Sequence, residues 1–404
     1  MVNIYRDDVD RNKHYIATYY LAVDHINTDY SLADAAFNLA VGQSIGNPTK
    51  RAEMETDEMF ENHSCLILAN EEDLKGEVRG EVKIAFPEAN IDFATDGISQ
   101  LLVQTMGGQM DIDIVHKCHL LDIEFTPTME ACLQGPKIGL KEVKEYCGIP
   151  DDQVILGGIT KPKIGLSPEQ HLELTKRLVD GGCNFIKEDE ILSGAAHCNM
   201  EKRVELVANY LRDTNSKVFY CASIHSDPAH LLERVKTVYN CGGNGVHVNF
   251  HCGLGAYKSI RELDLPMLIH YQKSGDKILN EVSHKYHIAP ELMFKLVSKS
   301  GCGTLHAGMI GGYLSDDEEY MKGIIKMLND QNSIPALSCG MHPGLVEYIK
   351  SVVGHCNWMA NVGGAITAHP MGTEAGARAM KQAVTGEYGK EFGVAVNKWG
   401  VKQP

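Results

Sequence analysis

The chain has 404 residues, enough for two domains with a large core, and its 44% hydrophobic and 23% charged residues are ordinary for a globular protein. A formal net charge of −15 argues against a general binder of nucleic acids or anionic membranes. The polar first residues, the lack of a long apolar run and 12 cysteines without a CxxC pair predict a cytoplasmic protein with reduced thiols and no membrane span.

Residues 1–135 are predicted to form an α+β domain of the ferredoxin-like kind. Runs rich in aromatic and β-branched residues predict strands, and apolar residues at helical spacing predict helices. The expected strands are 14–22, 64–69, 77–87 and 116–125, and the expected helices are 31–41 and 97–106. This mixture favours a small sheet with helices on one face.

From about residue 150 the pattern changes to a strand followed by a helix, repeated eight times. The apolar runs begin near Val154, Asn184, Val218, Gly245, Leu265, Thr304, Ile334 and Trp358. Capping boxes are expected for two of the helices, at Ser167 and Ser315. Eight such units predict a TIM (β/α)8 barrel over residues 136–404, so the fold class is α/β. A doubly wound open sheet is the alternative, but no GxGxxG follows the first strand.

Functional residues of a TIM barrel follow the carboxyl ends of its strands. All eight apolar runs of this chain end in polar or glycine residues, and strands with a purely structural role would not show this pattern at every end. In chain order these are Lys161 and Lys163, the KEDE group at 187–190, Ser223 and His225, Asn249 and His251, His270, His306, Ser338, and Asn361 with Gly363 and Gly364. We therefore expect one active site at this face of the barrel.

The KEDE sequence is the segment expected to carry the chemistry. Alternation along a strand points Lys187 and Asp189 to one side, and Glu190 can join them where the strand ends. Two carboxylates suit Mg²⁺, but an ammonium beside them would compete with the cation. Reaction of Lys187 with CO₂ to form a carbamate removes this conflict and supplies a third anionic oxygen. The competing interpretation is an ordinary solvated run of charges.

Lys161 and Lys163 flank Pro162, which restricts Lys161 to an extended conformation. If both converge on a carboxylate–metal site, one of them is suited to proton transfer, whereas the alternative is two solvated surface lysines. His270 and His306 have a similar alternative as hydrogen-bonded structural residues. Gly363-Gly364 follows the eighth strand, a usual phosphate position in barrels, although it could be only a tight turn.

These segments resemble the large-subunit family of ribulose-bisphosphate carboxylase. The resemblance is carried by GGITKPKIGLS (157–167), GGCNFIKEDE (181–190), SGCGTLHAGMIGGY (300–313), ALSCGMHP (336–343), NVGGAITAHPMG (361–372) and HYIATYYLA (14–22). It implies an N-terminal α+β domain, a C-terminal barrel, and a homodimer or higher assembly of dimers whose active sites lie between subunits.

By the same resemblance, Lys187 is the carbamylated lysine, and Asp189 and Glu190 complete the Mg²⁺ ligands. Lys161 matches the family's proton-transfer lysine, and the other matched positions surround it. They are Lys163 as its neighbour, His270 and His306 as strand-end histidines, and Ser338, Gly340, Gly363 and Gly364 as positions that hold substrate and phosphate.

Other positions depart from the carboxylase and resemble the RuBisCO-like proteins of form IV type, which do not carboxylate. The lysine that contacts incoming CO₂ is matched by Tyr313, and the arginine after the fifth-strand histidine is matched by Tyr271. The diketo-methylthiopentenyl-phosphate enolases of this group resemble the chain in KxDEIL and SCGMHPGLV. They place a base lysine in the loop matching Gly107-Gly108, and this chain has none there.

The resemblance therefore implies a Mg²⁺-dependent enolase or isomerase that moves a proton through an enediolate on a phosphorylated ketose-like metabolite. Sulfur-salvage compounds are one candidate class, and no carboxylation of ribulose 1,5-bisphosphate is expected. Lys161 and the carbamate on Lys187 are both candidate bases. One alternative is a decarboxylase or transcarboxylase acting on a phosphorylated 3-oxo acid. The other is a non-catalytic regulatory or binding protein, against which the complete KxDE set argues.

Overall fold

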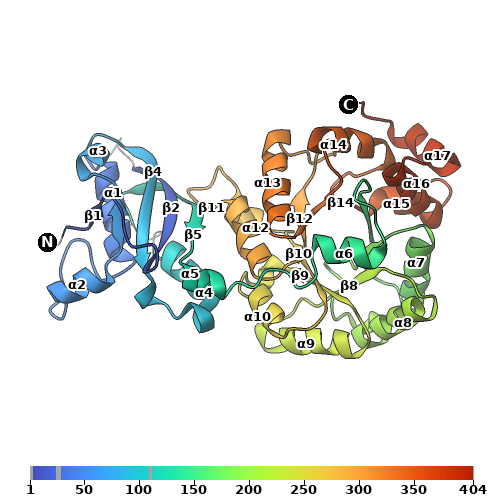
Figure 1. Ribbon diagram of the computed structural model, residues 1–404, viewed down its shortest axis with the longest axis horizontal. Coiled ribbons are helices and arrows are strands. Elements are labelled where there is room, and N and C mark those ends of the chain that lie inside the picture. Colours follow the sequence, from blue (N-terminus) through green and yellow to red (C-terminus); the bar gives the residue numbers. More distant parts are fainter. Residues whose placement is uncertain (1–2, 24–28, 109–111, 404) are drawn as a thin grey trace. The chain divides into compact units, whose positions relative to one another are not determined.

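The computed structural model describes residues 3–23, 29–108 and 112–403 (Figure 1). The chain divides into two compact units. The first is Met1–Gln134 with Gly275–Leu296, and the second is Gly135–Ser274 with Val297–Pro404. The sequence-based division after residue 135 did not anticipate that 275–296 belongs to the first unit.

The first unit is built on a six-stranded sheet in the order β1-β3-β4-β2-β5-β11. Its strands are β1 (Tyr5–Arg6), β2 (His14–Val23), β3 (Leu66–Leu68), β4 (Arg79–Pro87), β5 (Val115–Glu124) and β11 (Tyr286–Ile288). Its helices are α1 (Leu32–Gly42), α2 (Asp57–His63), α3 (Glu71–Lys75), α4 (Phe93–Met106), α5 (Pro127–Ala131) and α11 (Lys277–Asn280). The strands and helices expected here are present, and β11 is an addition from far along the chain.

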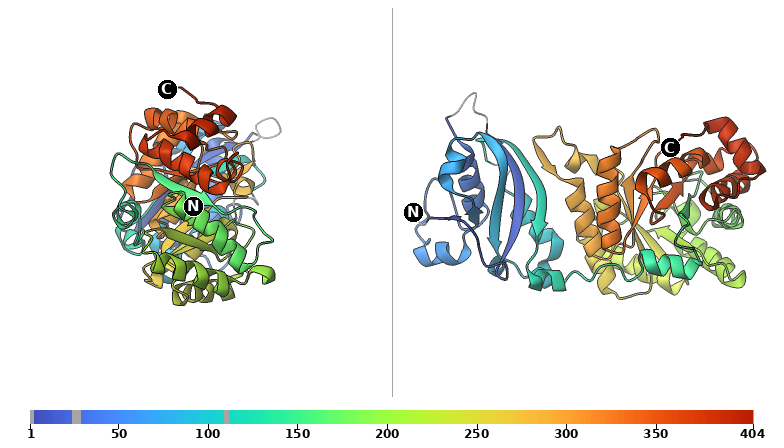
Figure 2. Two further views of the ribbon diagram at one scale, coloured as in Figure 1. Left: turned by 90° about the vertical axis from the view of Figure 1, so that its right-hand side faces the viewer. Right: turned by 45° about the horizontal axis from the view of Figure 1, so that its top comes forward.

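Helix α1 illustrates how the sequence determines this unit. Ser31 caps it in a capping box with Asp34, which satisfies backbone N–H groups at its first turn. Leu32, Ala36 and Leu39 are buried at helical spacing, so one face of the helix packs against β2 and β4 (Figure 2).

The second unit is a closed barrel of eight parallel strands in the order β10-β12-β13-β14-β6-β7-β8-β9 (Figure 1). The strands are β6 (Ile155–Ile159), β7 (Phe185–Lys187), β8 (Phe219–Ser223), β9 (Gly245–Asn249), β10 (Leu268–Gln272), β12 (Thr304–Gly308), β13 (Ile334–Leu337) and β14 (Met359–Val362). The predicted TIM barrel is therefore confirmed.

Helices surround the barrel, as the repeated pattern predicted. They are α6 (Leu140–Cys147), α7 (Pro168–Asp180), α8 (Met200–Asp213), α9 (Pro228–Asn240), α10 (Ala256–Glu262), α13 (Glu318–Asp330), α14 (Val346–Val353), α15 (Gly364–Thr367), α16 (Thr373–Thr385) and α17 (Lys390–Trp399). Helix α12 (Pro290–Lys299) contains the boundary between the two units, after Leu296. Among the described residues, no helix is both long and apolar enough to cross a bilayer.

The amino end of the barrel is filled by a hydrophobic core. Strand residues such as Ile155, Phe185 and Phe219 pack there with Val143 from α6. Strand β10 begins at Leu268, later than the expected start at Leu265, and Pro266 lies between the two positions. Proline has no N–H to donate to the strand ladder, which explains the shift.

One of the two predicted capping boxes is wrong. Ser167 caps α7 as expected, with Gln170 closing the box. Helix α13, however, begins at Glu318 and is capped by Asp317. Ser315 instead accepts a hydrogen bond from the N–H of Gly311, at 2.8 Å, and so helps to fold the loop after β12.

Candidate active site

A pocket of about 660 Å³ lies within the second unit, where the strand ends converge. All of the predicted site residues except His270 line it. They are Lys161, Lys163, Lys187, Asp189, Glu190, His306, Ser338, Gly340, Gly363 and Gly364. His270 is fully buried beside the Phe185 ring, 5.4 Å away between centroids, and does not line the pocket. The residues come from five strands, so only closure of the barrel brings them together.

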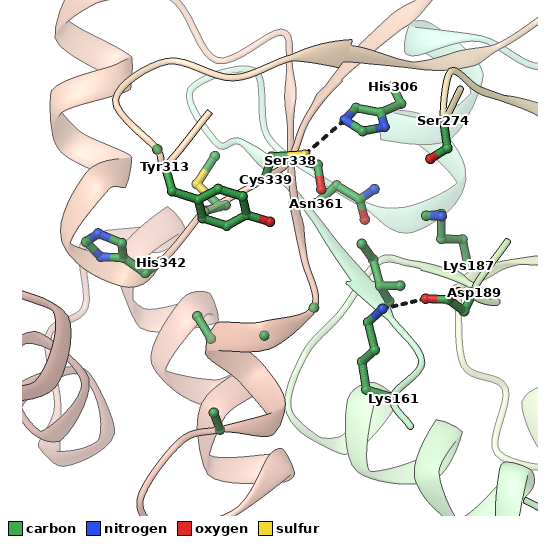
Figure 3. Close-up of a pocket in the computed structure, with 18 of the residues that line it drawn as sticks. Lys161, Lys187, Asp189, Ser274, His306, Tyr313, Ser338, Cys339, His342 and Asn361 are labelled. Carbon is green, nitrogen blue, oxygen red and sulfur yellow. Dashed lines mark hydrogen bonds and ion pairs between the residues drawn. The ribbon is translucent and has the colours of Figure 1, made fainter. Parts of the chain in front are cut away.

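The KEDE segment takes the alternating arrangement that its sequence predicts. Lys187 ends β7, and its side chain and that of Asp189 are buried at the pocket (Figure 3). Lys187 Nζ lies 3.3 Å from Glu190 Oε2, and the ammonium of Lys161 pairs with Asp189. The segment is therefore not a solvated run of charges.

Glu188 lies between these residues in sequence but does not line the pocket. Its two oxygens accept hydrogen bonds from Arg203 on α8, at 2.7 and 2.8 Å, and from the backbone N–H of Ser223 at 2.8 Å. The hydroxyl of Tyr220 donates to the same carboxylate, and His171 lies 3.0 Å from that hydroxyl. All of these side chains are buried, so the network fixes the direction in which β7 ends.

Burial lowers the pKa of the Lys187 amine, and the nearby charge of Lys161 lowers it further, although Glu190 and Asp189 act in the opposite direction. Burial also disfavours ionisation of Glu190. The charge of Lys187 and hydrogen bonds to the carboxylate outweigh that effect and lower the pKa of Glu190 to about 2. The site therefore combines an amine that readily loses its proton with a carboxylate that stays ionised.

A row of histidines lies behind Lys187. The ring of His247 is 4.9 Å from that of His225 and 5.2 Å from that of His270, measured between centroids. Burial lowers the pKa of His225 to about 4 and holds the pKa values of His247 and His270 well below their ordinary range. These rings are neutral at physiological pH. His225, which follows β8, was among the strand-end residues expected at this face of the barrel, whereas His247, within β9, was not.

Three further residues line the pocket that the sequence-based site did not include. Gln272 ends β10 and Ser274 follows it, and Cys339 follows β13 between the expected Ser338 and Gly340. Their positions at strand ends were the signal that could have found them. Asn361 on β14, which was among the expected strand-end residues, lines the pocket with both side-chain polar atoms buried and without a hydrogen-bond partner among the described residues.

Gly363 shows why a glycine follows β14. A Cβ atom on this residue would come within 3.3 Å of Lys161 Cε, closer than ordinary van der Waals contact. Glycine therefore leaves room for Lys161 to lie over the start of α15. Gly364 also lines the pocket, and a Cβ atom there would meet open space.

The side chains that line the pocket also determine whether it could bind a metal ion. Within the described part of the chain, no three His, Cys, Asp or Glu side chains are placed to hold a metal ion. Asp189 and Glu190 provide hard oxygen donors, and Lys187 is the remaining group between them. These two carboxylates suit a divalent cation, and a carbamate on Lys187 would add a third anionic oxygen in place of a competing ammonium.

Residues 139–392 match the family described as ribulose bisphosphate carboxylase large chain, catalytic domain. The match covers more than half of the chain. The chain belongs to this family. All of the site residues described above lie within the matched residues 139–392.

Named relatives of this family include both carboxylases and an enolase. A ribulose bisphosphate carboxylase from Archaeoglobus fulgidus is 27% identical, with 99% of each chain covered. A 2,3-diketo-5-methylthiopentyl-1-phosphate enolase from Geobacillus kaustophilus is 28% identical, with 91% of each chain covered. Both relatives are named as enzymes, but the two names describe different reactions.

Solved structures share the fold over almost the whole chain. An octameric ribulose-1,5-bisphosphate carboxylase/oxygenase from Pyrococcus horikoshii has a TM-score of 0.87 at 22% identity, covering 99% of this chain and 97% of that one. A rubisco-like protein from Burkholderia fungorum has a TM-score of 0.79 at 22% identity, covering 96% and 100%. The similarity establishes the architecture of this family.

Proposed function

We propose that the chain is a Mg²⁺-dependent enolase or isomerase acting on a phosphorylated ketose-like metabolite. The observation that carries the proposal is the grouping of Lys161, a proton-transfer amine, with Asp189, Glu190 and the buried Lys187 in one pocket. This grouping suits removal of a carbon-bound proton next to a carbonyl.

Lys161 is the proposed base. Its side chain is half-buried at the pocket, and its contact with Asp189 holds the nitrogen toward the cavity (Figure 3). As a neutral amine it can accept a proton from a substrate carbon that lies against it. A carbamate oxygen on Lys187 remains the alternative base.

The residues proposed to hold Mg²⁺ are Asp189, Glu190 and Lys187 modified by CO₂. Lowering of the Lys187 pKa by burial favours the neutral amine, the form that reacts with CO₂. When bound, the cation would polarise a substrate oxygen and so acidify the adjacent C–H group. The Glu188–Arg203 network holds the backbone of this ligand set in place.

The part of the pocket beside Lys163 and the two glycines after β14 is proposed to hold the substrate phosphate. Lys163 contributes a cation, and Gly363 and Gly364 leave backbone N–H groups uncovered by side chains. Ser338 adds a hydroxyl and Gly340 a further backbone group. The position after the eighth strand is a common phosphate site in TIM barrels.

We do not propose that the chain carboxylates ribulose 1,5-bisphosphate. The resemblance places Tyr313 where the carboxylase has the lysine that contacts incoming CO₂, and a tyrosine supplies no permanent cation there. Tyr271 is buried in β10, where the carboxylase has an arginine. The named enolase relative, 28% identical, supports the enolase class rather than one particular substrate.

Proton exchange in D₂O tests the proposal. The protein would be incubated with bicarbonate, Mg²⁺ and either 2,3-diketo-5-methylthiopentyl 1-phosphate or ribulose 1,5-bisphosphate, and exchange followed by NMR. We expect Mg²⁺-dependent exchange that falls about 10²- to 10⁴-fold in Lys161→Met. Lys202→Met, on the exposed first turn of α8, is the control.

Two outcomes would overturn the proposal. One is exchange that is equal with and without Mg²⁺, and the other is loss of a carboxylate from a phosphorylated 3-oxo acid without prior exchange, which would indicate a decarboxylase. Formation of 3-phosphoglycerate from ribulose 1,5-bisphosphate and labelled CO₂ would show that carboxylation is retained.

We further propose a homodimer or a higher assembly of dimers. The Pyrococcus horikoshii structure named above is octameric, and a similar fold covers 99% of this chain. Analytical ultracentrifugation at micromolar concentration is expected to show no monomer. A monomer that exchanges protons at full rate would contradict this.

A further inference from the structure

Cys339 and His306 form a pair in the wall of the pocket. Cys339 Sγ lies 3.8 Å from His306 Nε2 (Figure 3). His306 Nδ1 lies 3.0 Å from Gln272 Oε1, and Gln272 Nε2 donates to Ser274 Oγ at 2.9 Å. The amide is therefore oriented so that its oxygen accepts from Nδ1–H, which leaves the Nε2 lone pair facing the thiol.

The backbone holds Cys339 in an unusual conformation. Its φ of 76° lies in the left-handed region, which non-glycine residues seldom adopt. Gly340 follows with φ of 111°, and a Cβ there would lie 2.6 Å from the backbone nitrogen of Tyr313. The loop after β12 thus lies directly on the turn that carries the thiol, with the backbone and ring of Tyr313 against Gly340.

The thiol and Lys161 flank a common space. In the barrel order β13 carries Cys339, β14 carries Asn361 and β6 leads to Lys161. Asn361 is 1% exposed, lines the pocket, and has no hydrogen-bond partner for either polar atom among the described residues. An amide left in this way between two proton-transfer groups indicates that a polar ligand occupies the space between them.

We propose that Cys339 is a second proton-transfer residue of this pocket, whose thiol delivers a proton to one substrate carbon after Lys161 has taken a proton from another. The inference rests on the proposed function and makes it more specific, because it implies that the reaction is an isomerisation. The substrate is then a phosphorylated ketose-like compound with a hydroxyl-bearing carbon next to its carbonyl.

The step is balanced without an oxidant or reductant. A C–H bond breaks at a hydroxyl-bearing carbon next to the carbonyl as Lys161 gains the proton, and the electron pair forms the enediolate. The S–H bond of Cys339 then breaks as a C–H bond forms on the former carbonyl carbon, the hydroxyl proton passes to the neighbouring oxygen so that the carbonyl moves by one carbon, and a thiolate is left. The nearby charge of Lys273 stabilises that thiolate until solvent water carries a proton from Lys161 to the sulfur.

The surroundings suit a proton donor rather than a resting nucleophile. Burial raises the pKa of the Cys339 thiol, so it keeps its proton at neutral pH, although Lys273 acts in the opposite direction. Burial also lowers the pKa of His306 to about 3, so the ring is neutral and can accept the S–H hydrogen bond. Because S–H is a weak donor, turning it toward a substrate carbon costs little.

The test separates exchange from isomer formation. Wild type, Cys339→Gly and Cys339→Ser would be given ribulose 1,5-bisphosphate, which has a hydroxyl-bearing carbon next to its carbonyl, in D₂O with Mg²⁺ and bicarbonate. We expect the variants to retain exchange at the first carbon while isomer formation falls about 10²-fold or more. Glycine suits the left-handed backbone, so Cys339→Gly removes the thiol without straining the turn. Cys132→Ser, remote in sequence and in the first unit, is the matched control.

An unchanged ratio of isomer to exchange in Cys339→Gly would overturn the inference and leave the proposed function standing. Absence of exchange in the wild type would instead contradict the proposed function.

A second measurement tests the position of the thiol without requiring catalytic turnover. Alkylation by iodoacetamide, followed by mass spectrometry, should be slowed by ribulose 1,5-bisphosphate at Cys339 and not at Cys132. Equal protection of both cysteines, or of neither, would show that the thiol does not face the ligand.

Discussion

The ammonium of Lys161, after β6, pairs with the buried carboxylate of Asp189, after β7 (Figure 3). The proposed base and a proposed metal ligand are therefore in direct contact. A divalent cation at Asp189 and the Lys161 ammonium carry like charges, so they oppose one another. Removal of the positive charge at residue 161 is therefore expected to favour cation binding at Asp189.

Lys161→Met should accordingly separate metal binding from proton transfer. Removal of the neighbouring positive charge is expected to tighten Mg²⁺ binding in the presence of bicarbonate by about tenfold, equivalent to about 1.4 kcal/mol. Isothermal titration calorimetry measures this change, with the exposed Lys326→Met as a charge-matched control. Weaker Mg²⁺ binding in Lys161→Met would contradict the expected repulsion.

The pH dependence of carbamate formation follows from the buried amine. Burial lowers the pKa of Lys187, and only its neutral form reacts with CO₂. At fixed dissolved CO₂ the carbamate should therefore be lost as pH falls, with a midpoint below the value of about 10.4 for a free lysine. Carbon-13 NMR with labelled bicarbonate follows the signal, and Lys187→Arg should abolish it. A midpoint at or above the free value would show that Asp189 and Glu190 dominate over burial.

Arg203→Met tests the network behind the site. Burial works against ionisation of Glu188, but the charge and hydrogen bonds of Arg203 overcome it and lower the pKa of Glu188. In the wild type this stabilisation is present at neutral pH and is lost as pH falls through the lowered pKa. The variant leaves a buried carboxylate without its cation, which is expected to cost about 3–5 kcal/mol of unfolding free energy at pH 7.

The same variant should reverse the sign of the pH dependence. Without Arg203, burial raises the pKa of Glu188, so stability is lost as pH rises above the ordinary carboxylate range. Urea denaturation should find the variant less stable at pH 8 than at pH 5. Arg212→Met, whose side chain is 69% exposed, should change neither value appreciably. A variant as stable as wild type at pH 8 would mean that the network is not needed.

Cys339→Gly is expected to increase stability while it impairs the proposed reaction. The left-handed φ of 76° disfavours cysteine and suits glycine, so the free energy of unfolding should rise by about 0.5–1 kcal/mol. Thermal denaturation monitored by circular dichroism measures the change. Cys339→Ala, which keeps a Cβ in the same conformation, should give no such gain. A destabilised glycine variant would indicate that contacts of the sulfur outweigh the backbone strain.

The sequence by itself determined the elements and the order of the site. The strand periodicity placed all eight barrel strands, and alternation along β7 directed Lys187 and Asp189 into the pocket. Such patterns can be read because they depend on neighbours in the chain and on the solvent exposure of each face. The same local rules located the cap of α7, and they erred at Ser315 because acidic residues compete for the role of cap.

The tertiary structure decided the contacts between residues far apart in the chain. Strand β11 joins β5, Glu188 meets Arg203, and Cys339 meets His306, because separate segments are brought together when the sheet and the barrel form. No local period encodes which of several strand-end side chains will touch. The sequence therefore indicated which residues belong to the site, whereas closure of the barrel determined how they pair.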